Sequence, residues 1–469
     1  GLPFSSRNRP ICEYVCPPVA SSVCLRITSA NAASEANFEV DANAQVTFAS
    51  GLDSHGMIKL GAGTLNLTGW SNYSVSTDKT SVREGTLQLS GQGRVDGGIV
   101  VSAGAKLRFD LDNLAYVVSN GISGAGTVEH ANAYDLNLDG VSTFTGNLTI
   151  TGGGRLIAGS DQAFGAASAG YVVPGENAVV DFGMQAVAKN VDFRVASASV
   201  VNADNYRGTL FVRSGVRFDL APFERFGGTV DLENGSLYIY DSVPHNDAWS
   251  TTTVLNRLKG AGAVDYDGGT IADAADYSGT LTMRAGTRYN VSQQFGGSFS
   301  LSAPNTTLVL ESGAIAGSVS ATDGANAVSK ETADDFVLHG SNDLSAGLIV
   351  KDGKLTLRGP NILTGGVTIT GGVLELGHAD ALGLTGDIVF AGAYSVGGNG
   401  WIRYTADNQQ DISSRILIQD NCSINIDTNG QNIRFASVVD SGPFWADLVK
   451  KGAGDLILSP GANSSYGFS

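Results

Sequence analysis

Residues Leu363 to Leu376 read LTGGVTITGGVLEL, and this stretch decides the fold. It contains two short runs of alternating apolar residues, Val367 to Ile369 and Val373 to Leu376, separated by a Thr-Gly-Gly break. Alternation with a period of two is typical of strands that bury one face. The stretch therefore predicts two short β-strands joined by a tight turn, each with one face inside and the other in solvent.

The same pattern recurs at a nearly constant interval along the chain. An aromatic residue or Leu precedes a Gly, and the Gly precedes an apolar-x-apolar triplet. Equivalent glycines are Gly208 and Gly228 in one pair of neighbouring copies, and Gly279 and Gly297 in another. The repeat is therefore about 20 residues long, which corresponds to one turn of a solenoid. Further copies lie at residues 144–150, 344–350, 363–369 and 384–390.

The composition supports an all-β repeat protein and excludes several other classes. Gly makes up 62 of 469 residues, and Gly at this density would penalise helices by about 1 kcal/mol per residue. Charged residues make up only 16% of the chain, the formal net charge is −16, and no Lys-rich or Arg-rich run is present. We expect no nucleic-acid partner, because such a surface cannot neutralise phosphates. No apolar run approaches the roughly 18 to 20 residues that a membrane helix needs.

These observations predict an all-β, single-stranded parallel β-helix of roughly 20 rungs, in which each residue lies above its counterpart in the preceding rung. A propeller or a sandwich would need repeats of about 40 residues, or strands without a strict Gly register. Stacked glycines fit a β-helix because every rung repeats the same tight corner. At that corner positive φ is required, and a side chain would collide with its copy above.

A second motif, Gly-Ala-Gly followed by an apolar strand, recurs at longer range in residues 59–67, 122–128, 258–264 and 450–458. It resembles the autotransporter-associated β-strand repeat, also called the passenger-associated transport repeat, of Gram-negative autotransporter passenger domains. The copy most similar to that repeat spans Leu348 to Gly383 and departs from it by reading Asp-Gly-Lys in place of Gly-Ala-Gly. The glycines assigned to the structural repeat are Gly61, Gly63, Gly124, Gly126, Gly260, Gly262, Gly365, Gly371, Gly372, Gly452 and Gly454.

The resemblance implies a right-handed β-helical passenger, displayed on the surface of a Gram-negative bacterium or released after crossing the outer membrane through a C-terminal barrel. The sequence contains no such barrel, and its end inside a further repeat predicts a fragment of a longer protein. The alternative is a secreted β-helix without a translocator. We divide the chain into a Cys-bearing leader or cap at 1–28, a β-helix with degenerate repeats at 29–343, and C-terminal repeats at 344–469 that stop within a repeat.

The four cysteines are Cys12, Cys16, Cys24 and Cys422, and their spacing matches no zinc pattern. We therefore expect no metal site. Two alternatives are open for the three N-terminal thiols: a short disulfide that leaves one thiol unpaired, or three unpaired thiols. The sequence does not decide their pairing.

Candidate catalytic residues are few. Residues 440–442 read Asp-Ser-Gly, which resembles part of the Gly-Asp-Ser-Gly nucleophile motif of serine-protease autotransporters but lacks the leading Gly. A turn ended by Pro explains Ser441 better than catalysis does. The histidines form no pair at i, i+2 or i, i+4, so neither zinc nor a His general base is expected. They are His55, His130, His245, His339 and His378.

Three carboxylate pairs could serve the chemistry of β-helical polysaccharide lyases and glycosidases. Residues at i and i+2 share a strand face, so Asp265 and Asp267 could form a dyad separated by about 6 to 7 Å. The alternative is a solvated strand face. The same stretch could bind Ca²⁺ weakly, but the tandem nonapeptide of calcium-binding β-rolls is missing. The other two pairs are Asp110 with Asp112 and Asp334 with Asp335.

The sequence therefore favours a binding or structural protein without catalytic, cofactor-binding or metal-binding residues. We interpret it as a surface passenger that acts as an adhesin or self-association rod through its outer strands and loops, with a glycan or protein ligand. The alternative is a β-helical carbohydrate-active enzyme, which would need convergent titratable groups in a cleft. Four tryptophans are candidates for stacking on a sugar, with core or cap packing as the alternative: Trp70, Trp249, Trp401 and Trp445.

Overall fold

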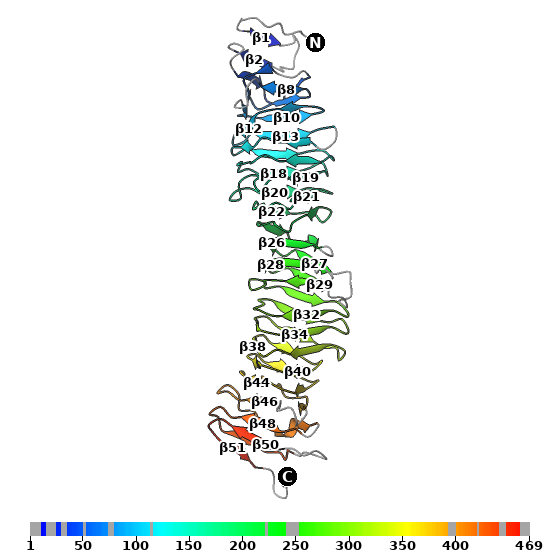
Figure 1. Ribbon diagram of the computed structural model, residues 1–469, viewed down its shortest axis with the longest axis vertical. Coiled ribbons are helices and arrows are strands. Elements are labelled where there is room, and N and C mark those ends of the chain that lie inside the picture. Colours follow the sequence, from blue (N-terminus) through cyan, green and yellow to red (C-terminus); the bar gives the residue numbers. More distant parts are fainter. Residues whose placement is uncertain are drawn as a thin grey trace. The chain divides into compact units, whose positions relative to one another are not determined.

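A computed structural model describes residues 11–15, 25–29, 35–49, 53–73, 79–112, 116–220, 224–240, 253–392, 400–419, 422–439 and 447–459. The chain divides into two compact units, Gly1–Phe218 with Glu224–Asp231, and Asp219–Phe223 with Leu232–Ser469. The described residues contain no α-helix, and their strands form a parallel β-solenoid of about 19 turns over the two units. The predicted all-β parallel β-helix is confirmed. Within each unit, successive turns lie one above another (Figure 1).

The first unit contains four sheets, each built from strands of successive turns. One has the order β1 (Ile11–Val15), β2 (Leu25–Ser29), β3 (Ala36–Val40), β6 (Met57–Leu60), β9 (Lys79–Val82), β12 (Gly98–Val101) and β15 (Ile122–Ser123). A second has β4 (Gln45–Phe48), β7 (Thr64–Leu67), β10 (Thr86–Ser90), β13 (Lys106–Asp110), β16 (Thr127–His130), β18 (Leu148–Ile150), β20 (Val172–Pro174), β22 (Val191–Phe193), β24 (Thr209–Val212) and β26 (Arg225–Leu232). The others contain β14 (Tyr116–Val118), β17 (Leu136–Leu138), β19 (Arg155–Ala158), β21 (Val179–Asp181) and β23 (Ser199–Val201), and β5 (Asp53–Ser54), β8 (Trp70–Tyr73) and β11 (Arg94–Val95).

The second unit follows the same plan, and boundaries between the units fall within β25 (Arg217–Leu220) and before the last residue of β26. One sheet has β27 (Ser236–Tyr240), β29 (Ala263–Asp267), β31 (Thr280–Met283), β33 (Ser298–Leu301), β36 (Val319–Ala321), β39 (Asn342–Asp343) and β42 (Asn361–Ile362), and β28 (Val254–Gly260) pairs with β30 (Thr270–Ile271). Another has β32 (Arg288–Val291), β34 (Thr307–Leu310), β37 (Ala327–Lys330), β40 (Leu348–Val350), β43 (Val367–Ile369), β45 (Ile388–Phe390) and β47 (Ile416–Ile418). A third has β35 (Gly313–Ile315), β38 (Asp335–Leu338), β41 (Lys354–Leu357), β44 (Val373–Leu376), β46 (Trp401–Arg403), β48 (Ile424–Asp427) and β50 (Leu448–Lys451), and β49 (Ile433–Phe435) pairs with β51 (Leu456–Leu458).

The first two strands pair antiparallel, unlike the strands of the solenoid turns. β1 pairs antiparallel with β2, and β2 pairs antiparallel with β3, whereas β3 pairs parallel with β6. Two antiparallel strands thus satisfy the edge of β3 that would otherwise present unpaired backbone groups.

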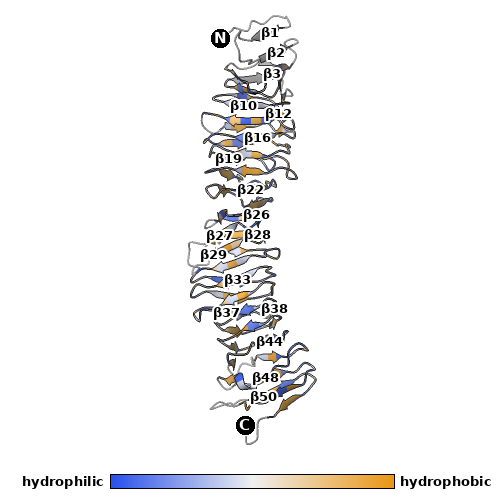
Figure 2. Ribbon diagram, turned by 180° about the vertical axis from the view of Figure 1, so that it is seen from behind, coloured by the Kyte–Doolittle hydropathy of each residue, from blue (hydrophilic) through white to orange (hydrophobic). Residues whose placement is uncertain are grey.

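The core consists of inward-facing columns of aliphatic side chains. Leu348, Val367 and Ile388 lie in direct register on β40, β43 and β45, and each is at most 1% exposed. The next inward column contains Val350, Ile369 and further buried apolar residues. Each such side chain contributes roughly 1.5 to 3 kcal/mol. The resulting alternation of hydrophilic and hydrophobic residues is clear in the sequence of β13, KLRFD, and blue and orange segments alternate along strands in this part of the molecule in Figure 2.

The Gly-Ala-Gly motif places its two glycines under different constraints. Gly61 has a φ of +73°, which only Gly adopts without strain. A Cβ at Gly63 would collide with the carbonyl oxygens of Asp41 and Ala44 in the preceding turn. The same arrangement recurs at Gly124 with Gly126 and at Gly260 with Gly262. Three other repeat glycines, Gly372, Gly452 and Gly454, also have positive φ. A Cβ at Gly365 would collide with the carbonyl oxygen of Ser345. The Gly371 amide donates a hydrogen bond to the Val350 carbonyl at 3.3 Å.

The aromatic residue that precedes Gly in the shorter repeat has a physical explanation in the fold. The Tyr277 ring is buried, and its hydroxyl donates to the Gly262 carbonyl at 2.8 Å. A Cβ at Gly297, in the following turn, would lie 2.6 Å from a ring carbon of Tyr277, and a Cβ at Gly279 would lie 2.7 Å from its hydroxyl oxygen. The two glycines therefore make room for the ring, as Gly208 and Gly228 do for Tyr206.

Candidate functional site: polar clusters on the outer faces of the sheets

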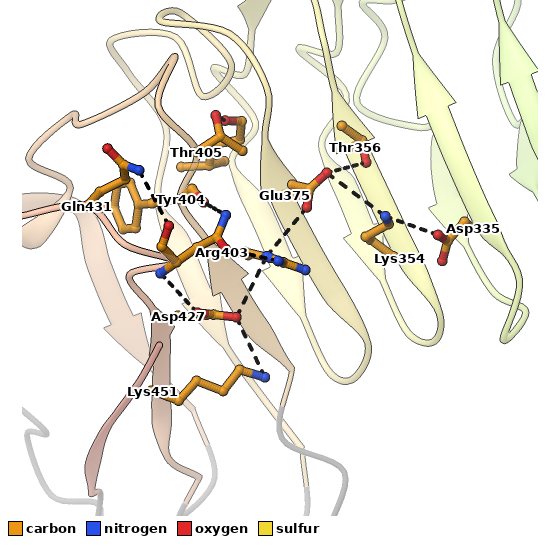
Figure 3. Close-up of polar contacts among 12 residues, drawn as sticks. Asp335, Lys354, Thr356, Glu375, Arg403, Tyr404, Thr405, Asp427, Gln431 and Lys451 are labelled. Atoms are coloured by element: carbon orange, nitrogen blue, oxygen red, sulfur yellow. Dashed lines mark hydrogen bonds and ion pairs between the residues drawn. The ribbon is translucent and has the colours of Figure 1, made fainter. Parts of the chain in front are cut away.

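A row of alternating charges follows the outer face of the sheet that contains β38, β41, β44, β46, β48 and β50 (Figure 3). Glu375, Arg403 and Asp427 lie in direct register on successive strands. Residues in register lie about 4.8 Å apart, so like charges would repel there, and alternating signs remove that repulsion. We call this row the charge ladder and define it as Asp335, Lys354, Glu375, Arg403, Asp427 and Lys451.

Glu375 lies between two cations and a hydroxyl donor. Its Oε1 is 4.0 Å from Lys354 Nζ and accepts a 3.0 Å hydrogen bond from Thr356 Oγ1, and its Oε2 is 3.6 Å from Arg403 Nε. The side chain is only 16% exposed. These partners link Glu375 to the turns on either side of its own.

The C-terminal part of the charge ladder combines ion pairs with an aromatic contact. Asp427 Oδ2 is 3.8 Å from Arg403 Nε and 3.9 Å from Lys451 Nζ. The Lys451 ammonium also lies 3.7 Å from the centroid of the Trp401 ring, so it covers that indole. The stacking candidate Trp401 is therefore already occupied by a cation of the charge ladder.

A second cluster lies on the outer face of β13, β16 and β18 in the first unit. Glu129 Oε2 accepts a 2.7 Å hydrogen bond from Lys106 Nζ, and its Oε1 accepts bonds from Arg108 at 3.1 Å and Thr151 Oγ1 at 3.0 Å. Burial alone would raise the pKa of Glu129, but the hydrogen bonds from Lys106 and Thr151 and the charge of Arg108 lower it. Glu129 is therefore an ionised partner that links three turns.

Glu331 shows the same chemistry in the second unit. Its Oε1 accepts from Lys351 Nζ at 2.7 Å and from Ser329 Oγ at 2.9 Å, and its Oε2 accepts from Arg288 at 3.0 Å. The Lys351 hydrogen bond, with smaller contributions from Ser329 and Arg288, lowers the pKa of Glu331 to about 2 despite partial burial. Such a group neither donates nor accepts a proton near neutral pH.

Asp265 and Asp267, the predicted dyad, have different partners in neighbouring turns. Both residues lie on the outer face of β29, but Asp265 Oδ2 faces Arg284 at 3.7 Å, whereas Asp267 Oδ2 accepts a 3.0 Å hydrogen bond from the Tyr238 hydroxyl. The Arg284 guanidinium also lies 4.5 Å from the centre of the Tyr238 ring. The two carboxylates are thus used in separate contacts between turns.

The other two carboxylate pairs are also divided. Asp110 accepts from Gln88 Nε2 at 3.3 Å and pairs with Arg108 at 3.5 Å, whereas Asp112 is exposed beyond the end of β13. Asp334 is exposed, and Asp335 belongs to the charge ladder through Lys354 at 3.0 Å.

The described histidines are dispersed in space. His130 is 1% exposed and faces inward between Phe109 and Ile150, and burial lowers its pKa. His378 Nδ1 accepts a 3.0 Å hydrogen bond from the Asp380 amide. His245 lies outside the described residues. Over the described ranges, no three His, Cys, Asp or Glu side chains lie close enough together to hold a metal ion.

The remaining residues that the sequence singled out lie apart from the clusters described above. Trp70 is 58% exposed at the start of β8. Cys422 is buried, and its Sγ lies 3.1 Å from the carbonyl oxygens of Phe390 and Gln419. Five further candidates lie outside the described residues: Ser441, Trp249, Trp445, Cys16 and Cys24. The pairing of the N-terminal thiols is therefore not described either.

Buried lysines are the functional groups that the sequence reasoning missed. Lys59 faces inward between Phe38 and Val82, and the residue is fully buried. Its Nζ turns back to donate to the carbonyls of Leu60 at 2.8 Å and Gly61 at 2.6 Å. Lys59 stands two residues before the corner glycine Gly61, whereas Lys189 precedes no nearby glycine, so the sequence carried no common signal for these lysines.

Lys189 has the same role in a different turn. Its Nζ donates to the carbonyls of Gly146 at 3.1 Å and Ala169 at 2.8 Å, and it lies 4.9 Å from the centre of the Phe144 ring. Burial lowers the pKa of Lys189 to about 8, and burial, opposed by Glu84, lowers that of Lys59 to the same value. These ammonium groups satisfy corner carbonyls and are withdrawn from solvent.

Comparison with known proteins supports the resemblance noted in the sequence. The family model of the passenger-associated-transport-repeat matches residues 57–89, 352–376 and 448–467. The chain therefore carries passenger-associated transport repeats, and repeats of this kind on a β-solenoid fit an autotransporter passenger. No curated protein matches the chain. No solved structure matches it either. Among the described residues there is no helix with the length and apolarity to span a membrane.

Proposed function

We propose that the chain is an autotransporter passenger that acts at the surface of a Gram-negative bacterium as an adhesin or in cell-to-cell association, without catalysing a reaction. The observation that carries this proposal is the match of three passenger-associated transport repeats on a β-solenoid. A passenger of this kind is exported across the outer membrane, so its outer strands and loops can contact a ligand outside the cell.

The electrostatics of the outer faces support a binding role over a catalytic one. Glu129, Glu331, Glu375 and Asp427 each contact at least two cationic side chains, so these carboxylates are engaged in ion pairs between turns. Asp265 and Asp267 each contact a different residue of a neighbouring turn. An extended surface of neutralised charges and hydrogen-bonding groups suits contact with a large glycan or protein ligand.

The test is display of the chain on bacterial cells through a heterologous outer-membrane translocator. Cells that display it should attach to a surface or aggregate, and cells that display the translocator alone should do neither. If display changes neither property while the purified chain degrades a polysaccharide, the enzyme alternative replaces this proposal.

A further inference from the structure

The most exposed described aromatic platform lies on the first unit, around Trp70. Trp70 is 58% exposed, whereas Trp401 is half-buried and the Lys451 ammonium lies over one face of its indole at 3.7 Å. An exposed indole presents a flat apolar face that a ligand can cover. Tyr134, another exposed aromatic residue among those described, is 47% exposed.

The indole of Trp70 is held in one orientation by its neighbours. Its Nε1 donates a 3.0 Å hydrogen bond to Asp96 Oδ2, and Arg94, its register partner on β11, places its guanidinium 5.1 Å from the ring centroid. Arg94 Nε also lies 3.5 Å from Asp96 Oδ1. One side of the ring thus contacts the guanidinium, and the large exposed fraction leaves apolar ring surface open to solvent.

Polar groups surround this platform. Arg94, Ser119 and Asn120 also border a small depression, lined mostly by apolar residues, that does not include Trp70, and the Asn120 side-chain amide donates to the Asp96 backbone carbonyl at 3.2 Å. Ser119 and Asn120 are exposed. Guanidinium, carboxylate, amide and hydroxyl groups thus border the rim of an apolar surface, and together they supply both donors and acceptors.

We propose that Trp70, Arg94, Asp96 and Asn120 form a binding subsite for an uncharged hexose unit of a glycan. A pyranose ring has a flat face of C–H groups that packs on an indole, and hydroxyl groups at its edge that pair with planar carboxylate, amide and guanidinium groups. Asp96 and Arg94 neutralise each other at the rim, and the chain carries a net charge of −16, which opposes acidic glycans. A neutral sugar therefore fits better than a uronic acid or a sialic acid. This inference rests on the proposed adhesin function and assigns it a ligand class and a site.

The test uses the purified chain and four immobilised probes: cellotetraose, β-1,4-galactotetraose, α-mannotetraose and tetragalacturonic acid. We expect binding to at least one neutral probe and none to tetragalacturonic acid. Trp70→Ala should weaken the affinity about tenfold or more, since exposed Trp anchors dominate such contacts, and Trp70→Phe should lose less because it keeps a flat ring. Trp401→Ala is the matched control and should bind as the wild type does.

Circular dichroism and thermal unfolding show whether each variant keeps its fold, and Trp70 is exposed enough that Trp70→Ala should unfold like the wild type. Failure to bind any neutral probe overturns the subsite, as does equal loss in Trp70→Ala and Trp401→Ala. In the display assay, cells carrying Trp70→Ala that attach as well as wild-type cells also overturn it while the proposed function stands. Cells displaying the wild-type chain that neither attach nor aggregate contradict the proposed function, and the probe measurements then decide the subsite independently.

Discussion

The inward columns of β43 give the sharpest test of the solenoid core. Val367 is 1% exposed and Ile369 is fully buried, and both face the interior between the equivalent residues of β40 and β45. Replacing both with Asp places two carboxylates in one turn of this core. Thr368 lies between them on the same strand and faces outward, so Thr368→Asp adds one carboxylate on the opposite face.

The expected loss of stability follows from the burial of the two side chains. Each contributes roughly 1.5 to 3 kcal/mol, so the lost burial alone costs about 3 to 6 kcal/mol. Two unpaired carboxylates in an apolar column add further desolvation cost or must take up protons. The total is comparable with the whole stability of a typical domain, about 5 to 15 kcal/mol. We expect the turns around β43 to unravel.

Limited proteolysis with fragment mapping by mass spectrometry measures this outcome. The wild type should give a resistant core that includes β40 to β48, and V367D/I369D should lose it. Thr368→Asp should keep the wild-type pattern, because an exposed charge on one strand changes the stability little. If the double variant keeps the protection pattern of the wild type, or if Thr368→Asp is cut as readily, these columns are not the core.

Three further outcomes can be measured. Glu331 has a pKa of about 2 in the fold against an ordinary 4.5. Its ion pairs therefore stabilise the native state above about pH 4.5 and lose this effect as the pH falls toward 2. In Glu331→Gln, the melting temperature should depend less on pH between these two values. Lys189 has a pKa of about 8 in the fold against an ordinary 10.5. Between these pH values the unfolded chain binds more protons than the folded chain, so the free energy of unfolding should rise with pH. Urea unfolding at about pH 8 and about pH 10 should show this rise in the wild type and not in Lys189→Met. Residues 344–458 should be the last part of the wild type to be digested, because the repeats there are the most regular, and a resistant core at residues 30–250 would contradict this expectation.

The local periodicity of the sequence determined the class of fold. The alternation in Val367 to Ile369 and Val373 to Leu376 allows only one face of each strand to be buried. Glycines that recur at a nearly constant interval require repeated corners. Both properties act within a few residues, so the parallel β-helix and the inward residues of these strands could be predicted. The Gly-Ala-Gly copies at Gly61 and Gly452 likewise pointed to the passenger-associated transport repeat that the family model matches.

The partners of the outer side chains were decided only by the tertiary structure. Thr356, Glu375, Arg403 and Asp427 share one outer column, yet the stretch of chain between neighbours in that column differs in length from turn to turn. Because the corners and loops between strands vary in this way, a fixed period cannot show which polar residue lies above which. The same reason gives Asp265 and Asp267 different partners, brings Asp96 to Trp70, and conceals the ammonium groups of the inward lysines. Sequence spacing determined which residues face inward, and the register of unequal turns determined which charges and rings meet.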